Sequence, residues 1–579
     1  MSTLYIEWKT IDWKLVQTKV FAWQQEIYTA SKKDDIKTVR KIQHKLLNSY
    51  EARLLAVRRV TQDNRGKKTA GVDGVKNLTP EQRLEMVGNL NFPTVSKPVR
   101  RVWIPKPGKK ELRPLGIPTM YDRCLQGLFK LAMEPEWEAR FESNSFGFRP
   151  GRNAHDAVGA IKHCITTGKK YVIDADITQC FPSINHTALL DKIGFKGKYR
   201  KQLKYWLKAG VIDANVFQKT EIGTPQGGII SPLLANIALH GLEKHLKGCF
   251  SDIPTFYGTS GKKISSTMVA KGLHVIRYAD DFVILHSSRE VIFRCLEETK
   301  KFLSTVGLEL SVAKTRLTHT LELGVNDTKE LGFDGELGFN FLGFTFKQFK
   351  SVHRSSTWRG TKLGYKTLIY PSKNSLKKHQ RKLREIILKT GKRLDQVRLI
   401  ALLNPVIRGW ASYFGVSDAN TMGFLSKQDR LMYLKLRKWS KQKGSVKKGS
   451  TYWFKTPTKN WKFGKKNVVS LVSHIEYSFP FGPGGYVRIR GESSPFDGNE
   501  KYWNDRNTSN PRHTTIVKIL LKKQKGKCKL CGLQFTDDDV MEKDHIIPLR
   551  KPLNGSNELK NLQLLHGHCH DTKTAQEKD

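Results

Sequence analysis

Helical spacing of apolar residues marks the first part of the chain. Residues 1–95 are mainly helical by pattern and basic, and the run from 32 to 60 contains neither Gly nor Pro. Apolar positions that recur every three or four residues are typical of amphipathic helices. We therefore expect a helical extension here that leads into the next unit.

The pattern changes at about residue 96. From 96 to 350, short apolar runs such as 171–173 and 282–285 alternate with helical stretches, which predicts an α/β or α+β body. Residues 251–272 interrupt this body with Gly, Ser and Lys, so we expect a surface insertion. Helical spacing returns from 373 to about 440, with dense Lys and Arg on the polar faces.

The carboxy-terminal part contains two different segments. Residues 441–512 are rich in Gly, Ser, Lys and aromatic side chains, a pattern of weak structure that suits base stacking. Residues 513–579 form a compact unit. With 579 residues, the chain is too long for one core, so we predict a multidomain α+β protein divided at about 95, 350, 440 and 512.

The large positive net charge indicates which class of molecule the chain binds. The chain has 101 Lys and Arg against 53 Asp and Glu, a formal net charge of +48. Such an excess repels itself unless a polyanion neutralises it, so nucleic acid is the expected partner. No apolar run reaches the roughly 18 residues of a membrane span, and the amino end lacks the order of a signal peptide. We expect no membrane partner and a soluble, intracellular protein.

Two adjacent carboxylates lie between apolar runs. Asp280 and Asp281 follow Val275-Ile276 and precede residues 282–285, which predicts a tight β-hairpin. Paired carboxylates in a turn are often only solvated, but they also supply the oxygen ligands of a two-metal site for phosphoryl transfer. A third ligand must come from elsewhere. Asp174 and Asp176 end another β-type run and lie on one face of it.

Cysteines crowd at the carboxy terminus. Five of the eight are scattered singly through the first half, whereas three lie in the last 52 residues. Cys528 and Cys531 form one knuckle and His566 and Cys569 form another. This spacing predicts a tetrahedral structural Zn²⁺ site.

The chain resembles the reverse transcriptase and maturase proteins that group II introns encode. Tyr278-Ala279-Asp280-Asp281 matches the active-site box of that family, and residues 176–181 match the box that carries its first catalytic aspartate. Further boxes follow in order along the chain: 71–74, 101–106, 113–118, 145–152, 223–228 with 231–232, 307–310 with 314–315, 341–344 and 404–410. The resemblance covers nearly the whole chain.

The resemblance implies a right-hand polymerase of fingers, palm and thumb. Its fingers and palm would occupy 96–350, its thumb or maturase region 351–440 and a basic DNA-binding region 441–512. Mg²⁺ would be held by Asp176, Asp280 and Asp281. The implied contacts to the incoming dNTP and template are Lys106, Arg113, Gln226, Lys314 and the sugar-selecting Phe181. Pro182 departs from the aspartate that many relatives carry there. Phe148 and Phe341 are interpreted as core aromatics.

The last unit resembles a zinc-containing ββα HNH endonuclease. The resemblance implies that Asp544 and His570 hold one catalytic divalent ion, that His545 is the general base and that Asn561 braces the loop. The alternative is a zinc-stabilised DNA-binding module without catalysis.

These features together predict a multifunctional intron-encoded protein. It would bind its intron RNA and assist splicing, nick a double-stranded DNA target and copy the RNA from the resulting 3′ hydroxyl. The alternatives are an RNA-binding splicing cofactor with a decayed polymerase, or a reverse transcriptase of another lineage. Bacterial cytoplasm and an organelle are both compatible with the sequence.

Overall fold

The computed structural model describes most of the chain. The described residues are 7–105, 111–213, 216–224, 227–250, 256–257, 263–322, 336–358, 360–443, 452–457, 461–482, 485–511, 513–536, 539–550 and 553–577. Among the predicted site residues, Lys106 and Gln226 lie outside them.

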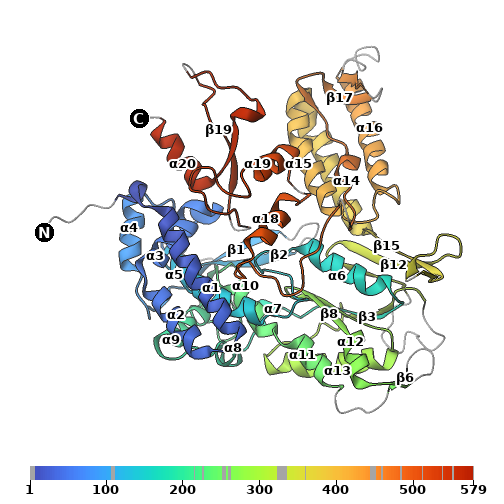
Figure 1. Ribbon diagram of the computed structural model, residues 1–579. Helices are drawn as coiled ribbons and strands as arrows, with labels where there is room; N and C mark the ends of the chain where they lie inside the picture. The colour runs from blue at the N-terminus through green and yellow to red at the C-terminus, as the bar shows by residue number, and fades with distance from the viewer. Residues whose placement is uncertain are drawn as a thin grey trace.

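Four helices form the amino-terminal part: α1 (Trp13–Lys32), α2 (Ile36–Asn48), α3 (Tyr50–Arg58) and α4 (Pro80–Asn89). The side chains of Asp12, Asp35 and Ser49 cap the first three, because each accepts a backbone N–H of the first turn. The buried face of α1 packs on the long helix α5 (Met120–Arg140), beside which it lies in Figure 1. The helical prediction for this stretch is confirmed.

A four-stranded antiparallel sheet lies at the centre. Its order is β10 (Arg316–His319), β3 (Tyr171–Ala175), β9 (Asp281–His286) and β8 (His274–Tyr278). Both faces are covered, one by α6 (Ala154–Thr166) and the other by α13 (Arg289–Thr305). Phe282 and Ile284 join the core with α13, whereas Val283 and Leu285 join the core with α6. Burial on both faces explains why residues 282–285 are continuously apolar.

A second sheet of order β2–β1–β4–β5 lies near the first helices. Its strands are β1 (Val99–Pro105), β2 (Leu112–Ile117), β4 (Val211–Asp213) and β5 (Val216–Gln218). Shorter helices connect the two sheets: α7 (Cys180–Ser183), α8 (His186–Ile193), α9 (Gly197–Leu207), α10 (Ser231–Leu239) and α11 (Leu242–Gly248). Part of the predicted insertion at 251–272, namely 251–255 and 258–262, lies outside the described residues; its described elements are β6 (Phe256–Tyr257), β7 (Lys263–Ile264) and α12 (Ser266–Gly272).

Small antiparallel sheets lead from the sheet of β10, β3, β9 and β8 into the next helices. Their strands are β11 (Phe339–Phe341), β12 (Phe344–Lys350) and β15 (Tyr365–Pro371), with the ribbon β13 (Thr357–Trp358) and β14 (Thr361–Lys362). Phe341 is buried, as predicted. The helices that follow are α14 (Lys373–Glu385), α15 (Gln396–Phe414) and α16 (Phe424–Gln442), which share a core of their own.

Residues 441–512 contain more structure than their composition indicates. Strands β16 (Trp453–Lys455), β17 (Trp461–Lys465) and β18 (Val469–Ser470) form a sheet that packs on α15. Phe463 is buried against the helices and Tyr486 is buried beside α6. The interpretation of these two rings as stacking platforms for bases is wrong, because both are core side chains; Trp461 is 57% exposed.

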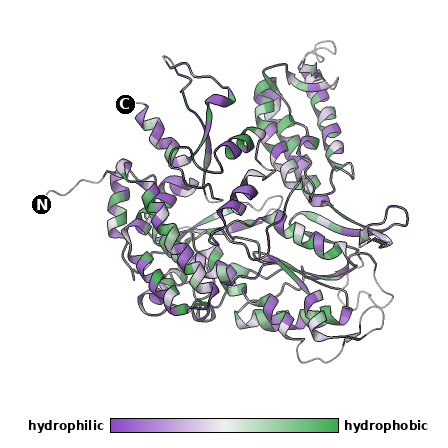
Figure 2. Cartoon of the chain, viewed as in Figure 1, coloured by the Kyte–Doolittle hydropathy of each residue, from purple (hydrophilic) through white to green (hydrophobic). Residues whose placement is uncertain are grey.

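The chain ends in a small ββα unit. Helix α18 (Glu500–Thr508) leads into α19 (Thr515–Lys523), and β19 (Met541–His545) pairs with β20 (Leu562–His566) before α20 (Gly567–Gln576). The prediction of a mixed α and β multidomain chain is confirmed. Hydrophobic and hydrophilic residues intermix along the helices of Figure 2, and the described helices include none with the length and apolar character of a membrane span.

Candidate catalytic and metal sites

The paired aspartates lie in the predicted hairpin. Tyr278 on β8 pairs with Asp281 on β9, so Ala279 and Asp280 form the two-residue turn between them. Ala279 has a φ of 59°, the left-handed conformation that tight hairpins require. Both carboxylates therefore stand at one end of a sheet that is buried on both faces.

Asp176 reaches the same end of the sheet. It directly follows β3, whose last residue Ala175 pairs with Phe282 of β9. Because the two strands are antiparallel, the next position, Asp176, lies beside Asp281. Its backbone oxygen accepts a hydrogen bond from the N–H of Ser311 at 2.8 Å. Its carboxylate lies 3.0 Å from Nζ of Lys314. Asp174, by contrast, lies inside the strand, paired with Val283 and Arg316.

Crowding of negative charge shows in the pKa values of this group. Loss of hydration and the neighbouring charges of Asp280 and Asp176 together raise the pKa of Asp281 to about 6. Burial and Asp176 also raise the pKa of Asp280, while Arg113 and Lys314 oppose the shift. Neighbouring carboxylates repel one another when they are ionised, and bound cations relieve that repulsion. The oxygen donor set fits Mg²⁺, which prefers carboxylates.

A buried network that the sequence did not reveal holds the hairpin from behind. Nη1 of Arg277 donates to Oδ1 of Asn236 at 2.9 Å and to the backbone oxygen of Ala279 at 3.1 Å. Nδ2 of Asn236 donates to the oxygen of Gly147 at 2.8 Å. A Cβ on Gly147 would lie 2.3 Å from the nitrogen of Ala279, so a glycine is required there. These residues fix the turn that carries the aspartates.

The glycines near Gln226 contact the protein itself. A Cβ on Gly227 would lie 2.6 Å from the backbone oxygen of Gly116 on β2, and its φ is 121°. Close packing against a strand therefore requires a glycine at position 227. Arg113 is exposed on the same strand, within electrostatic reach of Asp280.

Two phenylalanines meet beside the aspartates. Phe181 is half-buried in α7, five residues after Asp176, and its ring contacts that of Phe148 edge-on at 6.3 Å between centroids. The prediction that Phe148 is a core aromatic is wrong, because Phe148 is 49% exposed and its φ of 59° turns it away from the interior. The backbone of Pro182 packs closely on Gly223: a Cβ on Gly223 would lie 2.2 Å from the oxygen of Pro182, so only glycine fits there.

The four predicted zinc ligands converge. One ligand atom each from Cys528, Cys531, His566 and Cys569 lies within 4.8 Å of the others. Nδ1 of His566 faces Sγ of Cys531 at 3.3 Å, and its Nε2 lies 3.5 Å from Oδ2 of Asp539. A carboxylate behind a histidine is the usual partner that orients a zinc-binding imidazole, so this donor set fits Zn²⁺. Asp539 was not recognised from the sequence.

The residues predicted for the nuclease site gather at the end of β19 and on α20. Oδ1 of Asp544 lies 3.4 Å from Nε2 of His570, whose Nδ1 lies 2.6 Å from Oε2 of Glu542. Lys573 donates to Oδ2 of Asp544 at 2.7 Å and to the backbone oxygen of His545. Asp544 and His570 can thus hold a cation together, and Glu542 can orient His570. Glu542 and Lys573 were missed because neither belongs to the motif that was recognised.

Asn561 ties together the loop that follows His545. Its Oδ1 accepts from the N–H of Ile547 at 2.8 Å, and its Nδ2 donates to the oxygens of Ile547 and Ser556 at 2.9 and 2.8 Å. Nε2 of His545 lies 3.0 Å from Oδ1 of Asn557. The half-buried imidazole of His545 is therefore held at the mouth of the site.

Comparison with family models covers four segments of the chain. Residues 8–90 match the N-terminal domain of reverse transcriptase and residues 104–346 match reverse transcriptase (RNA-dependent DNA polymerase). Residues 376–459 match the maturase-specific domain of group II introns, and residues 528–576 match the HNH endonuclease.

Curated relatives agree with these matches. Protein YkfC of Escherichia coli (strain K12) is 34% identical over 314 residues, 49% of this chain and 77% of that protein. The group II intron-encoded protein LtrA of Lactococcus lactis subsp. cremoris is 29% identical over 454 residues, 69% of this chain and 74% of that protein. The chain belongs to the group II intron-encoded proteins.

As a group II intron-encoded protein, the chain combines three domains with different functions. One is an RNA-directed DNA polymerase, one is an HNH endonuclease, and the third is the maturase domain of group II introns. A third relative, the uncharacterized 91 kDa protein in the cob intron of Schizosaccharomyces pombe, is 28% identical over 367 residues, 55% of this chain and 43% of that protein.

Proposed function

We propose that the chain folds as a right-hand polymerase with a maturase region and a nuclease attached. Residues 1–95 form the RNA-binding extension, 96–350 the fingers and palm, 351–440 the thumb, 441–512 the DNA-binding region and 513–579 the nuclease. The sheet of β3, β8, β9 and β10 is the palm in this proposal. The exposed Lys and Arg of α14, whose buried residues are His379 and Leu383, form a surface for RNA.

The polymerase centre consists of Asp176, Asp280 and Asp281 in this proposal. Two Mg²⁺ ions bound there would lower the pKa of the primer 3′ hydroxyl and stabilise the leaving pyrophosphate. The three carboxylates position primer and triphosphate in line, and Arg277 with Asn236 keeps the hairpin rigid while they do so. Arg113 and Lys106 neutralise phosphate charge, Gln226 contacts sugar or base, and Lys314 balances the carboxylates.

Phe181 selects the sugar of the incoming nucleotide. Its ring would pack under a deoxyribose and collide with a 2′ hydroxyl, which discriminates by repulsion of the wrong substrate. The edge-on contact with Phe148 supports this role, because an exposed neighbour holds the ring in place without burying it in the core.

In the nuclease, His545 acts as general base, and Asp544 with His570 would hold one divalent ion, which would stabilise the charge of the cleaved phosphodiester. Asn561 keeps the loop after His545 in shape. Glu542 orients His570 by accepting a hydrogen bond from its Nδ1–H. Cys528, Cys531, His566 and Cys569 hold a structural Zn²⁺ that stabilises the unit.

The biological partners are the intron RNA, a double-stranded DNA target and dNTPs. The intron RNA is inserted into one DNA strand, and the nuclease, with His545 as general base, cleaves the other strand. The polymerase then extends the new 3′ end and copies the RNA. Bacterial cytoplasm, close to the nucleoid, or an organelle is the proposed location. Sequencing the RNA that copurifies with the protein tests this assignment, since a group II intron must be enriched over other transcripts.

One observation carries the proposal: Asp176, Asp280 and Asp281 meet at one sheet end, where burial and the two neighbouring carboxylates together raise the pKa of Asp281 to about 6. A splicing cofactor with a decayed polymerase has no need to keep this costly arrangement. Primer extension on an RNA template with Mg²⁺ and dNTPs separates the two functions. DNA synthesis supports the polymerase, whereas splicing assistance without synthesis supports the cofactor.

A further inference from the structure

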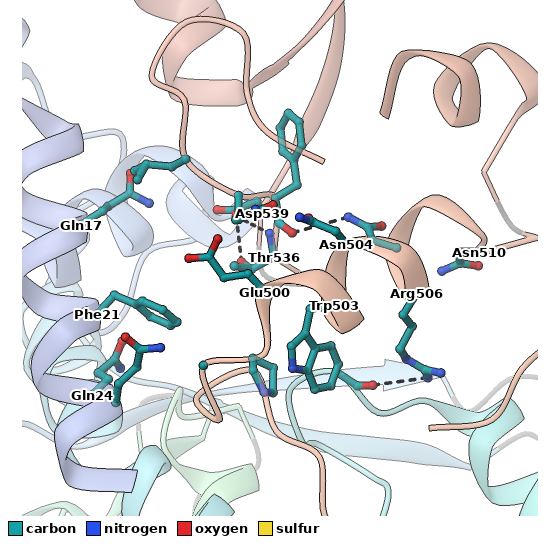
Figure 3. Close-up of a pocket in the computed structure, with 18 of the residues that line it drawn as sticks. Gln17, Phe21, Gln24, Glu500, Trp503, Asn504, Arg506, Asn510, Thr536 and Asp539 are labelled. Atoms are coloured by element: carbon teal, nitrogen blue, oxygen red, sulfur yellow. Dashed lines mark hydrogen bonds between the residues drawn. The ribbon is translucent and has the colours of Figure 1, made fainter. Parts of the chain in front are cut away.

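A cavity of about 270 Å³ lies where three parts of the chain meet. Its walls come from α1, from α18 and from residues 533–536 and Asp539 of the carboxy-terminal unit, as Figure 3 shows. Ligand pockets commonly measure about 300–1,000 Å³, so this cavity suits a small, flat group. The residues that line it include none of the proposed catalytic or metal-binding side chains.

Aromatic rings reach the cavity from two of its walls. Phe21 projects from α1 and Trp503 from α18 (Figure 3). Neither ring is loose: Phe21 packs on Phe496 at 6.2 Å between centroids, and Nε1 of Trp503 donates to the oxygen of Ser494 at 3.1 Å. Rigid aromatic faces of this kind bind planar rings by stacking.

An amide in the wall lacks partners. Within the described part of the chain, both Nε2 and Oε1 of Gln534 are buried and make no hydrogen bond. A buried polar group that stays unpaired destabilises the protein, so this amide gains a partner when binding shifts the cavity wall and opens the amide to the ligand. The missing partner must offer an acceptor and a donor side by side, because the carboxamide presents one of each.

Two of the charged groups around the cavity are already engaged, and the lining also includes one further cation, Arg59, and one further anion, Glu500. Arg506 pairs with the buried Asp156 at 2.7 Å, and Asp539 lies 3.5 Å from His566. Such a lining offers stacking and amide hydrogen bonds in preference to strong attraction for phosphate. A neutral planar ring with adjacent donor and acceptor groups matches it.

We propose that this cavity receives one unpaired nucleobase of a nucleic acid bound to the chain. Nucleobases carry adjacent donors and acceptors on their edges, and proteins that bind single strands stack such bases on aromatic side chains and bond their edges. The net charge of +48 brings the polyanion to the surface, and the cavity then takes a base from it. The inference rests on the nucleic-acid binding of the proposed function and adds a base-specific contact whose residues belong to neither proposed catalytic centre.

Photocrosslinking of the full-length protein tests the cavity. The probes are single-stranded RNA and DNA of about 20 nucleotides, longer than the roughly 4–16 nucleotides of a typical single-strand site, each carrying 5-iodouracil in place of U or T. This base forms bonds with aromatic side chains that it stacks on. Mass spectrometry should find crosslinks in the peptides that contain Phe21 or Trp503, and the two probes show whether RNA or DNA supplies the base.

Gln534→Leu separates recognition from structure. Because the amide is unpaired in the free protein, Leu should not lower the unfolding temperature, while crosslinking in the cavity should fall about tenfold, equivalent to about 1.4 kcal/mol. Gln576→Leu, an exposed position of the same unit, is the matched control and should change neither quantity.

The possible results are distinct. Crosslinks confined to other peptides, or equal cavity crosslinking in Gln534→Leu, overturn the inference and leave the proposed function standing. Absence of all binding to both probes contradicts the nucleic-acid partner itself. A lower unfolding temperature in Gln534→Leu with unchanged crosslinking assigns Gln534 a packing role only.

Discussion

Lys314 Nζ lies 3.0 Å from Oδ1 of Asp176, although 138 positions separate the two residues in the sequence. The hydrogen bond from the N–H of Ser311 to the oxygen of Asp176 brings the turn of Lys314 beside the end of β3. The ammonium also opposes the effect of burial on the pKa of Asp280 and Asp281. One lysine therefore balances a group of three carboxylates.

Lys314→Met should slow DNA synthesis. A hydrogen bond to a charged group contributes about 1.5–3 kcal/mol, so removal of this one predicts a fall of roughly ten- to a hundredfold in kcat/KM for dNTP. Single-nucleotide primer extension measures it, with Lys300→Met on α13 as the control for loss of one surface charge. Unchanged kcat/KM in a folded Lys314→Met protein would show that the contact plays no part in synthesis.

Phe181→Val should relax the choice of sugar. If the ring excludes the 2′ hydroxyl, its truncation raises the rate with rNTP relative to dNTP by about tenfold for each 1.4 kcal/mol of clash removed. Paired single-nucleotide extensions give the ratio. If Phe181 is instead an ordinary packing residue, truncation to Ala lowers stability by about 3–5 kcal/mol and leaves the ratio as in the parent.

Loss of zinc should unfold only the last unit. Cys531→Ser, or truncation at about residue 512, should remove one zinc per chain and leave primer extension intact, because structural zinc contributes directly to folding. Asp539→Ala should weaken zinc by about 10–100-fold through the orientation of His566. Metal analysis and protease digestion check these results, and a zinc-free parent protein would show the ligand assignment to be wrong.

A buried histidine pair should make the thumb-like helices sensitive to acid. His379 stacks on Trp410 at 4.4 Å and its Nε2 lies 2.8 Å from Nε2 of His474. Burial, together with the charges of His474 and Lys435, lowers the pKa of His379 to about 3. The unfolded chain therefore binds the proton more readily, so this contribution to stability is complete above pH 6.5 and is lost progressively as pH falls towards 3.

His379→Phe keeps an aromatic ring and removes the titration. The parent should lose up to about 1.4 kcal/mol per pH unit below pH 6.5 from this group, which the variant should not. Urea unfolding of both proteins between pH 7.5 and 5.5 gives the difference, so that effects of the other buried histidines cancel. Parallel pH profiles for parent and variant would contradict the assignment.

Local sequence was enough to predict some parts of the site and not others. Asp280 and Asp281 were predictable because a hairpin is built from consecutive residues, and the zinc ligands because their knuckles have fixed spacing. Arg277 and Asn236 were not, because their hydrogen bond joins side chains 41 positions apart that carry no motif.

Phe148 shows the limit of a hydrophobicity argument. Its apolar side chain favours a core position, but the left-handed backbone after Gly147 turns it outward against Phe181. In the same way, the composition of 441–512 indicated weak structure, whereas Phe463 and Tyr486 are buried by packing against α15 and α6 that no local pattern contains.

The central claim is that one chain holds two separate catalytic centres. A DNA target, intron RNA and dNTPs are incubated with Asp281→Asn, with His545→Ala or with the parent, and second-strand nicks and new DNA are measured in the same reaction. Asp281→Asn should nick and support splicing but make no DNA. His545→Ala should make no nick, yet extend a primer annealed in advance at the parental rate. Loss of both activities in either folded variant would contradict the claim.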